Sequence, residues 1–364
     1  MISPLYGTLL MFAVAGVLIY LAIAKKYEPT LLLPIGFGTL LGNLPNSPLN
    51  QPGGLLYILN EVGIKTELFP LFIFIGIGAL MDFRPLLSQP IFTLMGAAGQ
   101  LGIFVTLVLA TVIGFPLKQA SSIAIIGAID GPTSIYVSAL LAPELLAAIA
   151  VTAYSYMSLV PIIQPPIMRL LTTRAERRIH MEYAPRPVTR TAVVAFPIVV
   201  TIAIGLLVPQ SAPLVATLMF GNLLKESGVV QRLSDTAANE LTNISTLFLG
   251  LTIGSLMQAG SFLKMQTLLI LLLGLAAFVL DTVAGIIFGK ALAILTRGKI
   301  NPLVGAAGIS AFPMSGRLVQ RVAQEEDFTN HVLMHAMGAN TAGQLGSVIA
   351  GGILLALVTN ILNP

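Results

Sequence analysis

One carboxylate lies in an apolar stretch that the sequence predicts to break a helix. Asp130 stands in the middle of "GAIDGPTSI" (127–135), and a Gly-Pro pair follows it at once. Proline cannot donate a backbone hydrogen bond and clashes with the preceding turn, so the carbonyls of Ala128 and Ile129 are expected to lose their partners. These carbonyls would form the negative end of a half-helix over 121–129. Together with the carboxylate they would suit a hard cation, although Asp130 could instead only cap the helix break.

A second apolar stretch offers neutral ligands and one positive charge. "NPLVGAAGISAFPMSGRLVQ" (301–320) contains no acidic residue, but it has amide and hydroxyl side chains at Asn301, Ser310 and Ser315. Arg317 follows, and its guanidinium stays charged and can hold a carboxylate through two hydrogen bonds. A cation site at the first break and an anion-binding residue at the second would then lie along one path. Arg317 could equally be an ordinary positive charge on the cytoplasmic side.

The elements that carry these breaks are those of a membrane protein. Of the 364 residues, 56% are hydrophobic and 9% are charged, whereas about 25% are charged in an ordinary soluble domain. A helix of about 20 apolar residues crosses the hydrocarbon core of a bilayer. Windows of this kind occur at 5–24, 91–115, 145–168, 192–209, 265–289 and 330–359. The chain is therefore predicted to be an all-α polytopic membrane protein, and it has no cysteine for disulfide or thiolate chemistry.

Weak internal similarity indicates two related halves. "FGTLL" (37–41) matches "FGNLL" (220–224), "LFIFIGIGALM" (71–81) matches "LFLGLTIGSLM" (247–257), and "GAIDGPT" aligns with "GISAFPM". The matches occur in the same order at similar offsets. We therefore predict a duplication with a first repeat at 1–173 and a second at 188–364.

A basic stretch separates the halves. "RAERRIHMEYAPRPVTR" (174–190) is the most basic part of the chain, and the positive-inside rule assigns it to the cytoplasm. We take 174–187 as a cytoplasmic linker. With the N-terminus outside, each half crosses the membrane an odd number of times, which gives the halves opposite orientations. Two inverted repeats with discontinuous, re-entrant helices near mid-membrane, including 121–141, are typical of secondary transporters and their ion sites.

Five motifs resemble those of one protein family. They are "LAIAKKYEPTLLLPIGFGTLLGNLP" (21–45), "GALMDFRPLLSQP" (78–90), "GAIDGPTSI", "NPLVGAAGISAFPMSGR" and "LMHAMGANTAGQLGS" (333–347). The chain is similar, over almost its whole length, to the membrane beta subunit of the sodium-pumping, biotin-dependent decarboxylases. These enzymes act on oxaloacetate, methylmalonyl-CoA, glutaconyl-CoA or malonate. The resemblance implies a subunit that decarboxylates carboxybiotin and couples this reaction to outward Na⁺ transport with proton uptake.

The resemblance also implies roles for particular residues. The family's central sodium-site aspartate corresponds to Asp130, and a tyrosine in the following helix corresponds to Tyr156. The other positions that match family motifs are Asn301, Gly305, Ser310, Arg317 and Asn340. We expect all of these except Arg317 to be Na⁺ ligands, and we expect catalytic roles for Asp130, Tyr156 and Arg317, with Arg317 binding carboxybiotin. Asp281 departs from the family, in which a small or hydroxylated residue is expected at this position. The sequence leaves open whether Asp281 is an additional titrating group.

The implied cofactors and partners lie outside this chain. The Met-Lys-Met signature that carries biotin is absent, because Lys264-Met265 follows a leucine, so carboxybiotin is expected on a partner subunit. The resemblance implies a carboxyltransferase and biotin-carrier alpha subunit, a small membrane gamma subunit, and a trimer of this chain in the inner (plasma) membrane. Na⁺ is the expected ion, no Walker motif indicates ATP, and no nucleic-acid partner is expected.

Two other functions are compatible with the residues alone. A stand-alone Na⁺/H⁺-type secondary transporter would have the same inverted repeats, and cation exchange by the isolated chain would favour it. A membrane anchor for a soluble complex would have no use for an intramembrane acid. The sequence leaves open which acid or acyl-CoA is decarboxylated, the preference among Na⁺, H⁺ and Li⁺, the stoichiometry and the oligomeric state.

Overall fold

The long apolar helices predicted from the sequence are present. The computed structural model describes residues 4–181, 187–262 and 264–362, and the regular elements in these ranges are all helices. Six stretches among them are long and apolar enough to cross a membrane: Leu5–Ala24, Phe92–Ile113, Pro143–Leu171, Arg190–Leu207, Met265–Leu295 and Leu333–Ile361. They coincide with the six apolar windows, so the prediction of an all-α polytopic membrane protein is confirmed.

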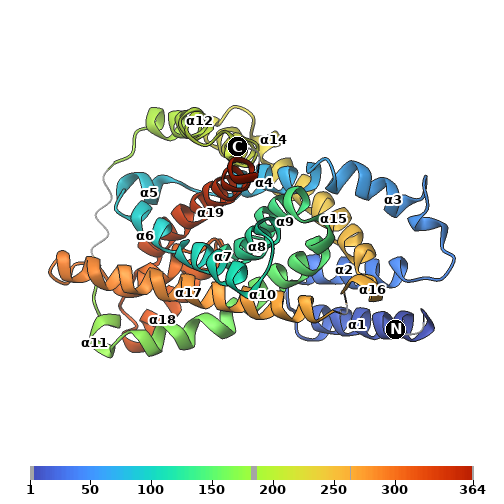
Figure 1. Ribbon diagram of the computed structural model, residues 1–364. Coiled ribbons are helices and arrows are strands. Elements are labelled where there is room, and N and C mark those ends of the chain that lie inside the picture. Colours follow the sequence, from blue (N-terminus) through green and yellow to red (C-terminus); the bar gives the residue numbers. More distant parts are fainter. Residues whose placement is uncertain (1–3, 182–186, 263, 363–364) are drawn as a thin grey trace.

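The helices follow one another in the order shown in Figure 1. They are α1 (Pro4–Ala24), α2 (Pro29–Gly42), α3 (Leu55–Leu59), α4 (Leu68–Leu80), α5 (Arg84–Ser88), α6 (Phe92–Ala98), α7 (Leu101–Ile113), α8 (Leu117–Ala124), α9 (Gly131–Leu141), α10 (Leu146–Leu171), α11 (Arg174–Arg177), α12 (Arg190–Leu207), α13 (Ala212–Ser227), α14 (Gln231–Thr236), α15 (Thr242–Leu256), α16 (Ala259–Phe262), α17 (Met265–Leu295), α18 (Met314–Glu326) and α19 (Leu333–Leu362). Two 3₁₀ segments, η3 (Ile125–Ala128) and η7 (Pro302–Gly308), form the breaks that the sequence singled out.

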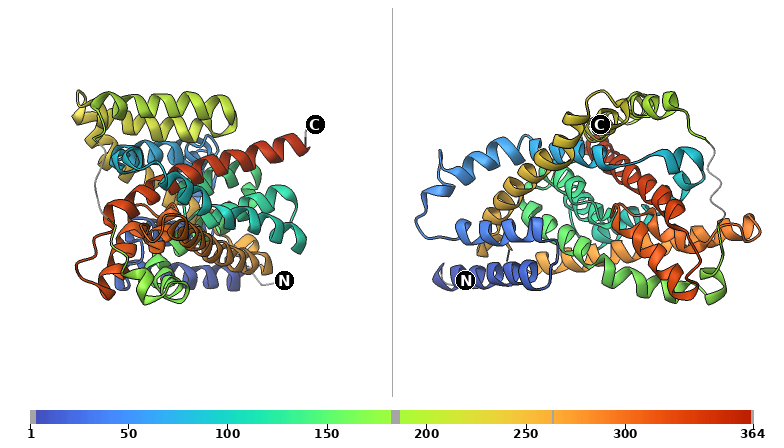
Figure 2. Two further views of the ribbon diagram at one scale, coloured as in Figure 1. Left: turned by 90° about the vertical axis from the view of Figure 1, so that its left-hand side faces the viewer. Right: turned by 180° about the vertical axis from the view of Figure 1, so that it is seen from behind.

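The two breaks lie in the middle of the molecule. In Figure 1, α12 lies along the upper edge, α17 crosses the lower part, and α8, α9 and α19 lie between them. Figure 2 shows this layering from the side, with the yellow-green helices α12 and α13 as the upper layer. Apolar side chains of both breaks, such as Ile126 and Val304, are fully buried and belong to the same core. The breaks are therefore surrounded by protein, the condition under which irregular backbone is tolerated at membrane depth.

Glycines bring helices of the two halves into close contact. A Cβ on Gly38 of α2 would lie 2.2 Å from the carbonyl oxygen of Leu251 on α15. A Cβ on Gly221 of α13 would likewise lie 1.8 Å from the carbonyl oxygen of Ile75 on α4. The sequence matched α2 with α13 and α4 with α15, so these two contacts are the pair that a two-fold relation would require. The inverted repeat itself stays a prediction.

The crossing expected over 91–115 is interrupted. α6 and α7 are separate helices, and Gln100 lies between them and donates from Nε2 to the carbonyls of Gly308 (3.1 Å) and Gly343 (3.3 Å). The carboxylate of Asp281, on α17, accepts a hydrogen bond from the backbone amide of Gly102 in the first turn of α7. A sequence window cannot reveal this interruption, because the polar partners come from distant parts of the chain.

The predicted linker, 174–187, is docked against the second half. It begins with α11, and Arg177 pairs with Glu326 at the end of α18 (2.5 Å). His180 pairs with the next residue, Asp327 (2.8 Å). Residues 182–186 lie outside the described residues. The basic stretch therefore contacts the acidic end of α18 through an ion pair and a hydrogen bond.

Candidate cation site and its cavity

Asp130 lies at the junction of two short helices. The α8 helix gives way to η3, and Ile129 then adopts a left-handed backbone conformation (φ 54°). Asp130 is the N-cap of α9, and Pro132 stands in the first turn of that helix, where its missing N–H has no partner to lose. The expected half-helix over 121–129 is therefore wrong in its bounds. A β-branched residue at positive φ is an outlier of the kind that clusters at functional sites.

Neutral donors surround the Asp130 carboxylate, which is 3% exposed. Its Oδ2 accepts hydrogen bonds from Thr133 Oγ1 (2.7 Å), Gln344 Nε2 (2.6 Å) and Ser347 Oγ (2.7 Å). Its Oδ1 accepts only from the Thr133 amide, at 3.3 Å, among the described residues. A buried carboxylate requires a counter-charge or a proton in addition to neutral donors. One oxygen of Asp130 is thus available to a cation or a proton.

The second break touches the first at Ala128. The amide of Ser310 donates to the carbonyl oxygen of Ala128 at 3.1 Å, and the Ser310 hydroxyl donates to the carbonyl of Gly343 at 3.0 Å. The expectation that the Ala128 carbonyl lacks a partner is therefore wrong, because the other break supplies the donor. The contact brings the two candidate motifs, far apart in sequence, to one place.

Asn340 lies beside this contact. Its Nδ2 donates to the carbonyl of Ile309 at 2.7 Å, and Ile309 is the neighbour of Ser310. Its Oδ1 is buried and has no hydrogen-bond partner in the described part of the chain. Since a buried polar atom without a partner is costly and calls for an explanation such as an ion or water, this oxygen is a candidate ligand.

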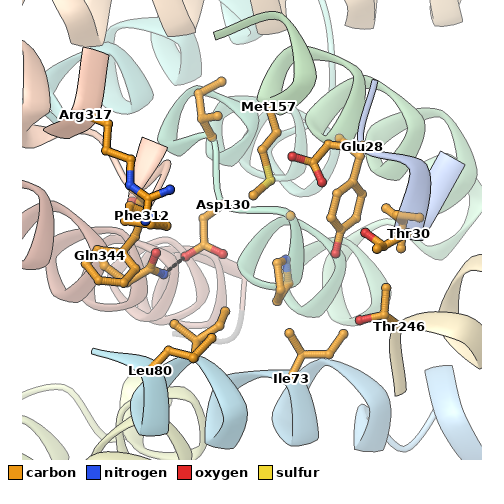
Figure 3. A pocket seen from close by; sticks show the side chains of 18 of the residues that line it. Glu28, Thr30, Ile73, Leu80, Asp130, Met157, Thr246, Phe312, Arg317 and Gln344 are labelled. Carbon is orange, nitrogen blue, oxygen red and sulfur yellow. Dashed lines mark hydrogen bonds between the residues drawn. The ribbon is translucent and has the colours of Figure 1, made fainter. Parts of the chain in front are cut away.

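A cavity of about 470 Å³ joins Asp130 to Arg317. Ser310, Glu28 and Tyr154 also line it, and much of the remaining wall is apolar. Figure 3 shows Arg317 and Glu28 on opposite sides of the cavity, with Asp130 between them. The cavity therefore presents one guanidinium and two carboxyl groups to a common space.

Arg317 is available to bind an anion. It lies on α18 and is exposed, whereas neighbouring apolar side chains of that helix, such as Val319, are buried. Its guanidinium makes no hydrogen bond or ion pair with another residue in the ranges that the structure covers. A guanidinium of this kind can bind a carboxylate through two parallel hydrogen bonds.

Asn301 and Gly305 lie away from the cavity. Asn301 caps η7, and its Nδ2 donates to the backbone carbonyls of Arg177 (3.1 Å) and Ile179 (2.9 Å). Gly305 faces α17, where a Cβ would lie 1.9 Å from the carbonyl oxygen of Gly285. Neither residue is among those that line the cavity. In this structure Asn301 binds the linker, and Gly305 packs the second break against α17.

Tyr154, rather than Tyr156, faces the cavity. Residues that are two apart in an α-helix are rotated by about 200° around its axis. The rings of Tyr154 and Tyr156 therefore point to opposite faces of α10. Tyr156 donates from its hydroxyl to the carbonyl of Leu271 on α17 at 2.6 Å. The ring of Tyr154 covers Gly131, whose Cβ, if present, would lie 2.2 Å from Tyr154 Cζ. The sequence analysis missed Tyr154 because the family motif pointed to Tyr156.

Gln344 and Ser347, which hold Asp130, were also missed. With Asn340 they occupy positions i, i+4 and i+7 on α19, and this spacing places three polar side chains on one face of a mostly apolar helix. That signal was present in "LMHAMGANTAGQLGS". Polar residues at helical spacing could therefore have identified the helix that faces Asp130.

The chain is similar to one protein family over nearly its whole length. Residues 7–358 match the family described as the Na⁺-transporting oxaloacetate decarboxylase beta subunit. The chain belongs to this family. Together with the long apolar helices, membership makes the chain a multi-pass inner-membrane subunit of a Na⁺-translocating decarboxylase, as its resemblance implied.

Individual relatives are similar over nearly their whole length. The beta subunit of glutaconyl-CoA decarboxylase from Acidaminococcus fermentans is 51% identical, over 97% of this chain and 94% of the relative. The beta subunit of methylmalonyl-CoA decarboxylase from Veillonella parvula is 49% identical, with 97% and 94% covered. The oxaloacetate decarboxylase beta chain from Klebsiella pneumoniae is 45% identical, with 97% and 95% covered. These names imply a complex with other subunits.

Proposed function

We propose that this chain decarboxylates carboxybiotin delivered by a partner subunit and couples the reaction to outward Na⁺ movement and proton uptake. The observation that supports this proposal most is the single cavity lined by both Asp130 and Arg317. A cation site and an anion site that share one space allow the loss of a carboxylate to alter the stability of a bound cation. The relatives' names differ in the acid or acyl-CoA, which agrees with a substrate chosen by another subunit.

Asp130 is the proposed centre of the Na⁺ site. Its Oδ1 accepts only one long hydrogen bond from the described residues, and Ser310 and Asn340 would supply neutral oxygens nearby. No group of three or more His, Cys, Asp or Glu side chains that could hold a metal occurs among the described residues. A single carboxylate with neutral oxygens suits a monovalent cation, and the same carboxylate can hold a proton in its place.

Direct Na⁺ binding by Tyr156, Asn301 and Gly305 would require another conformation. Here the polar atoms of Tyr156 and Asn301 have backbone partners away from the cavity, and Gly305 packs against α17. Alternating access in transporters of inverted repeats involves movement of one repeat against the other. We propose such a movement of 1–173 against 188–364 around the contact between the breaks.

Arg317 is the proposed binding residue for the carboxylate of carboxybiotin. The fork geometry of its guanidinium orients a planar carboxylate. Once CO₂ leaves, the nitrogen left behind needs a proton and Arg317 loses its partner. Asp130 can give up Na⁺ and accept a proton in the same cycle, which links the two events.

The proposed partners are those implied by the family. They are a carboxyltransferase and biotin-carrier alpha subunit, a small membrane gamma subunit, and further copies of this chain in a trimer. The cytoplasmic ends of α11 and α18, with their ion pairs, lie beside Asn301 of the second break and would be near a cytoplasmic partner.

Transport by the purified chain in lipid vesicles tests the proposal. We expect Na⁺ to accumulate only while carboxybiotin is consumed, and we expect decarboxylation of free carboxybiotin to require Na⁺. A stand-alone transporter would exchange Na⁺ for protons down an imposed pH gradient without carboxybiotin. Exchange by the isolated chain, together with no Na⁺-dependent loss of CO₂, would overturn the proposal.

A further inference from the structure

A second acid lines the cavity, and the proposed mechanism does not use it. Glu28 lies between α1 and α2 and is half-buried. It occupies the N-cap position of α2, but its side chain does not cap the helix. The carboxyl group makes no hydrogen bond or ion pair with another residue that the structure describes. In Figure 3 it lies across the cavity from Arg317.

The backbone of Glu28 has an uncommon conformation. Its φ and ψ of 33° and 60° lie in the left-handed region, which few residues other than glycine adopt. Such conformations persist where the surrounding structure imposes them, and they cluster at active sites. Lys25 and Lys26, immediately before it, are exposed and make no ion pair with it. No local contact therefore explains why this carboxyl group faces the cavity.

Tyr154 lies near both Glu28 and Asp130. It is buried, lines the same cavity, and is close enough to interact electrostatically with both acids. Its hydroxyl makes no hydrogen bond to another described residue. The cavity thus contains two acids with a phenol near both.

Burial favours the protonated form of Glu28. Glu28 lies outside the membrane-length helices, and loss of solvent raises the pKa of its carboxyl group above the ordinary value. A general acid works best when its pKa approaches the working pH. A half-buried carboxyl beside an apolar cavity can therefore hold a proton that a solvated glutamate would lose.

We infer that Glu28 is the general acid that protonates the biotin nitrogen when CO₂ leaves. The inference rests on the proposed function. The N–C bond of the N-carboxylate breaks, and its electron pair stays on nitrogen. The proton of the Glu28 carboxyl moves to that nitrogen, which yields CO₂, biotin and the Glu28 carboxylate. A proton from solvent then restores the Glu28 carboxyl group.

The charged and titratable groups near Glu28 are consistent with this direction of transfer. They are Lys25, Lys26 and Tyr27 on its own segment, Tyr154 on α10, Asp130 at the first break and Arg317 across the cavity. The lysines are exposed, and Arg317 would be occupied by the carboxylate of the substrate. Arg317 and Glu28 would therefore hold opposite ends of the reacting group, one as a cation and the other as an acid.

Glu28→Gln in the complete complex tests this role. Since general acid catalysis contributes about 10²–10⁴-fold, we expect kcat for carboxybiotin decarboxylation to fall about 100-fold, with KM and Na⁺ binding little changed. Activity of the wild type should fall as pH rises through the pKa of Glu28, and Glu28→Gln should lose that dependence. Formate should partly restore the activity of Glu28→Ala.

Glu67→Gln is the matched control. Glu67 also precedes a helix, α4, with left-handed backbone (φ 63°), and it is partly buried, but it does not line the cavity. An unchanged kcat and pH profile in Glu28→Gln, as in the control, would refute the role of Glu28. If Glu28→Gln does not fold, failure of formate to rescue Glu28→Ala would refute it instead. Absence of Na⁺-dependent decarboxylation in the wild type would overturn the proposed function itself.

Discussion

The hydroxyl of Ser347 is expected to set how much Na⁺ the protein needs. Ser347 is fully buried on α19 and donates to Oδ2 of Asp130 at 2.7 Å. Ser347→Ala removes one donor from a buried carboxylate and leaves its other donors, Thr133 and Gln344, in place. The ionised, cation-binding form of Asp130 then becomes less stable relative to the protonated form.

The size of the effect follows from that hydrogen bond. A hydrogen bond to a charged group contributes about 1.5–3 kcal/mol, and about 1.4 kcal/mol changes an equilibrium tenfold. Ser347 is also within reach of the Gln344 carbonyl, at 2.9 Å, so its proton is shared and the lower value applies. The Na⁺ concentration for half-maximal activity should therefore rise about tenfold, and more at low pH, where protons compete for Asp130.

The assay is the Na⁺ dependence of carboxybiotin decarboxylation at two pH values. Ser138→Ala is the control, because Ser138 is equally buried on α9 but donates only to backbone carbonyls of its own helix, at 2.6 and 3.2 Å. We expect the control to keep the wild-type Na⁺ requirement. Identical Na⁺ curves for the Ser347 and Ser138 variants would refute the argument that the donors of Asp130 tune its cation affinity.

Three further predictions concern other parts of the site. Arg317→Lys should be substantially impaired in decarboxylation and Arg317→Ala more so, with Na⁺ binding unchanged, because lysine lacks the paired donors; wild-type turnover of the lysine variant would remove the carboxylate-binding role. A single cysteine at Ala175 should resist an impermeant reagent outside intact cells while one at Lys118 reacts, and labelling of Ala175→Cys would contradict the cytoplasmic linker. Asp281→Ala should lower the stability of the folded protein by about 1–2 kcal/mol because the Gly102 amide loses its acceptor, whereas Asp281→Asn keeps it; equal melting temperatures would exclude a capping role.

The sequence predicted those parts of the fold that depend on the length of an apolar stretch. All six long windows are helical, with the one over 91–115 divided into α6 and α7, since the backbone polar groups of about 20 apolar residues can be satisfied at membrane depth only in this way. Composition could not reveal the interruption at Gln100, because its bonds to Gly308 and Gly343 cross long sequence distances. The two-fold relation of the halves remains a prediction, which the glycine contacts of α2 with α15 and α4 with α13 support.

The site was predictable to the extent that residue type reveals function. An acid beside a Gly-Pro pair identified Asp130, and an arginine after the second break identified Arg317, and both line the cavity. The left-handed backbone of Ile129 could not be predicted from residue types. The donor for the Ala128 carbonyl could not be predicted either, because it comes from the other break. Helical spacing alone could have found the face of α19 that holds Asp130.

Uptake of radioactive Na⁺ by vesicles that contain the complex with Asp130→Asn tests the central claim most directly. The amide keeps the shape of the carboxylate but lacks the charge that a cation requires. We expect carboxybiotin-driven Na⁺ uptake and Na⁺-stimulated decarboxylation to be abolished together, while the variant folds and assembles normally. Na⁺ uptake by Asp130→Asn at near the wild-type rate would contradict the account and would place the ion site elsewhere in the protein.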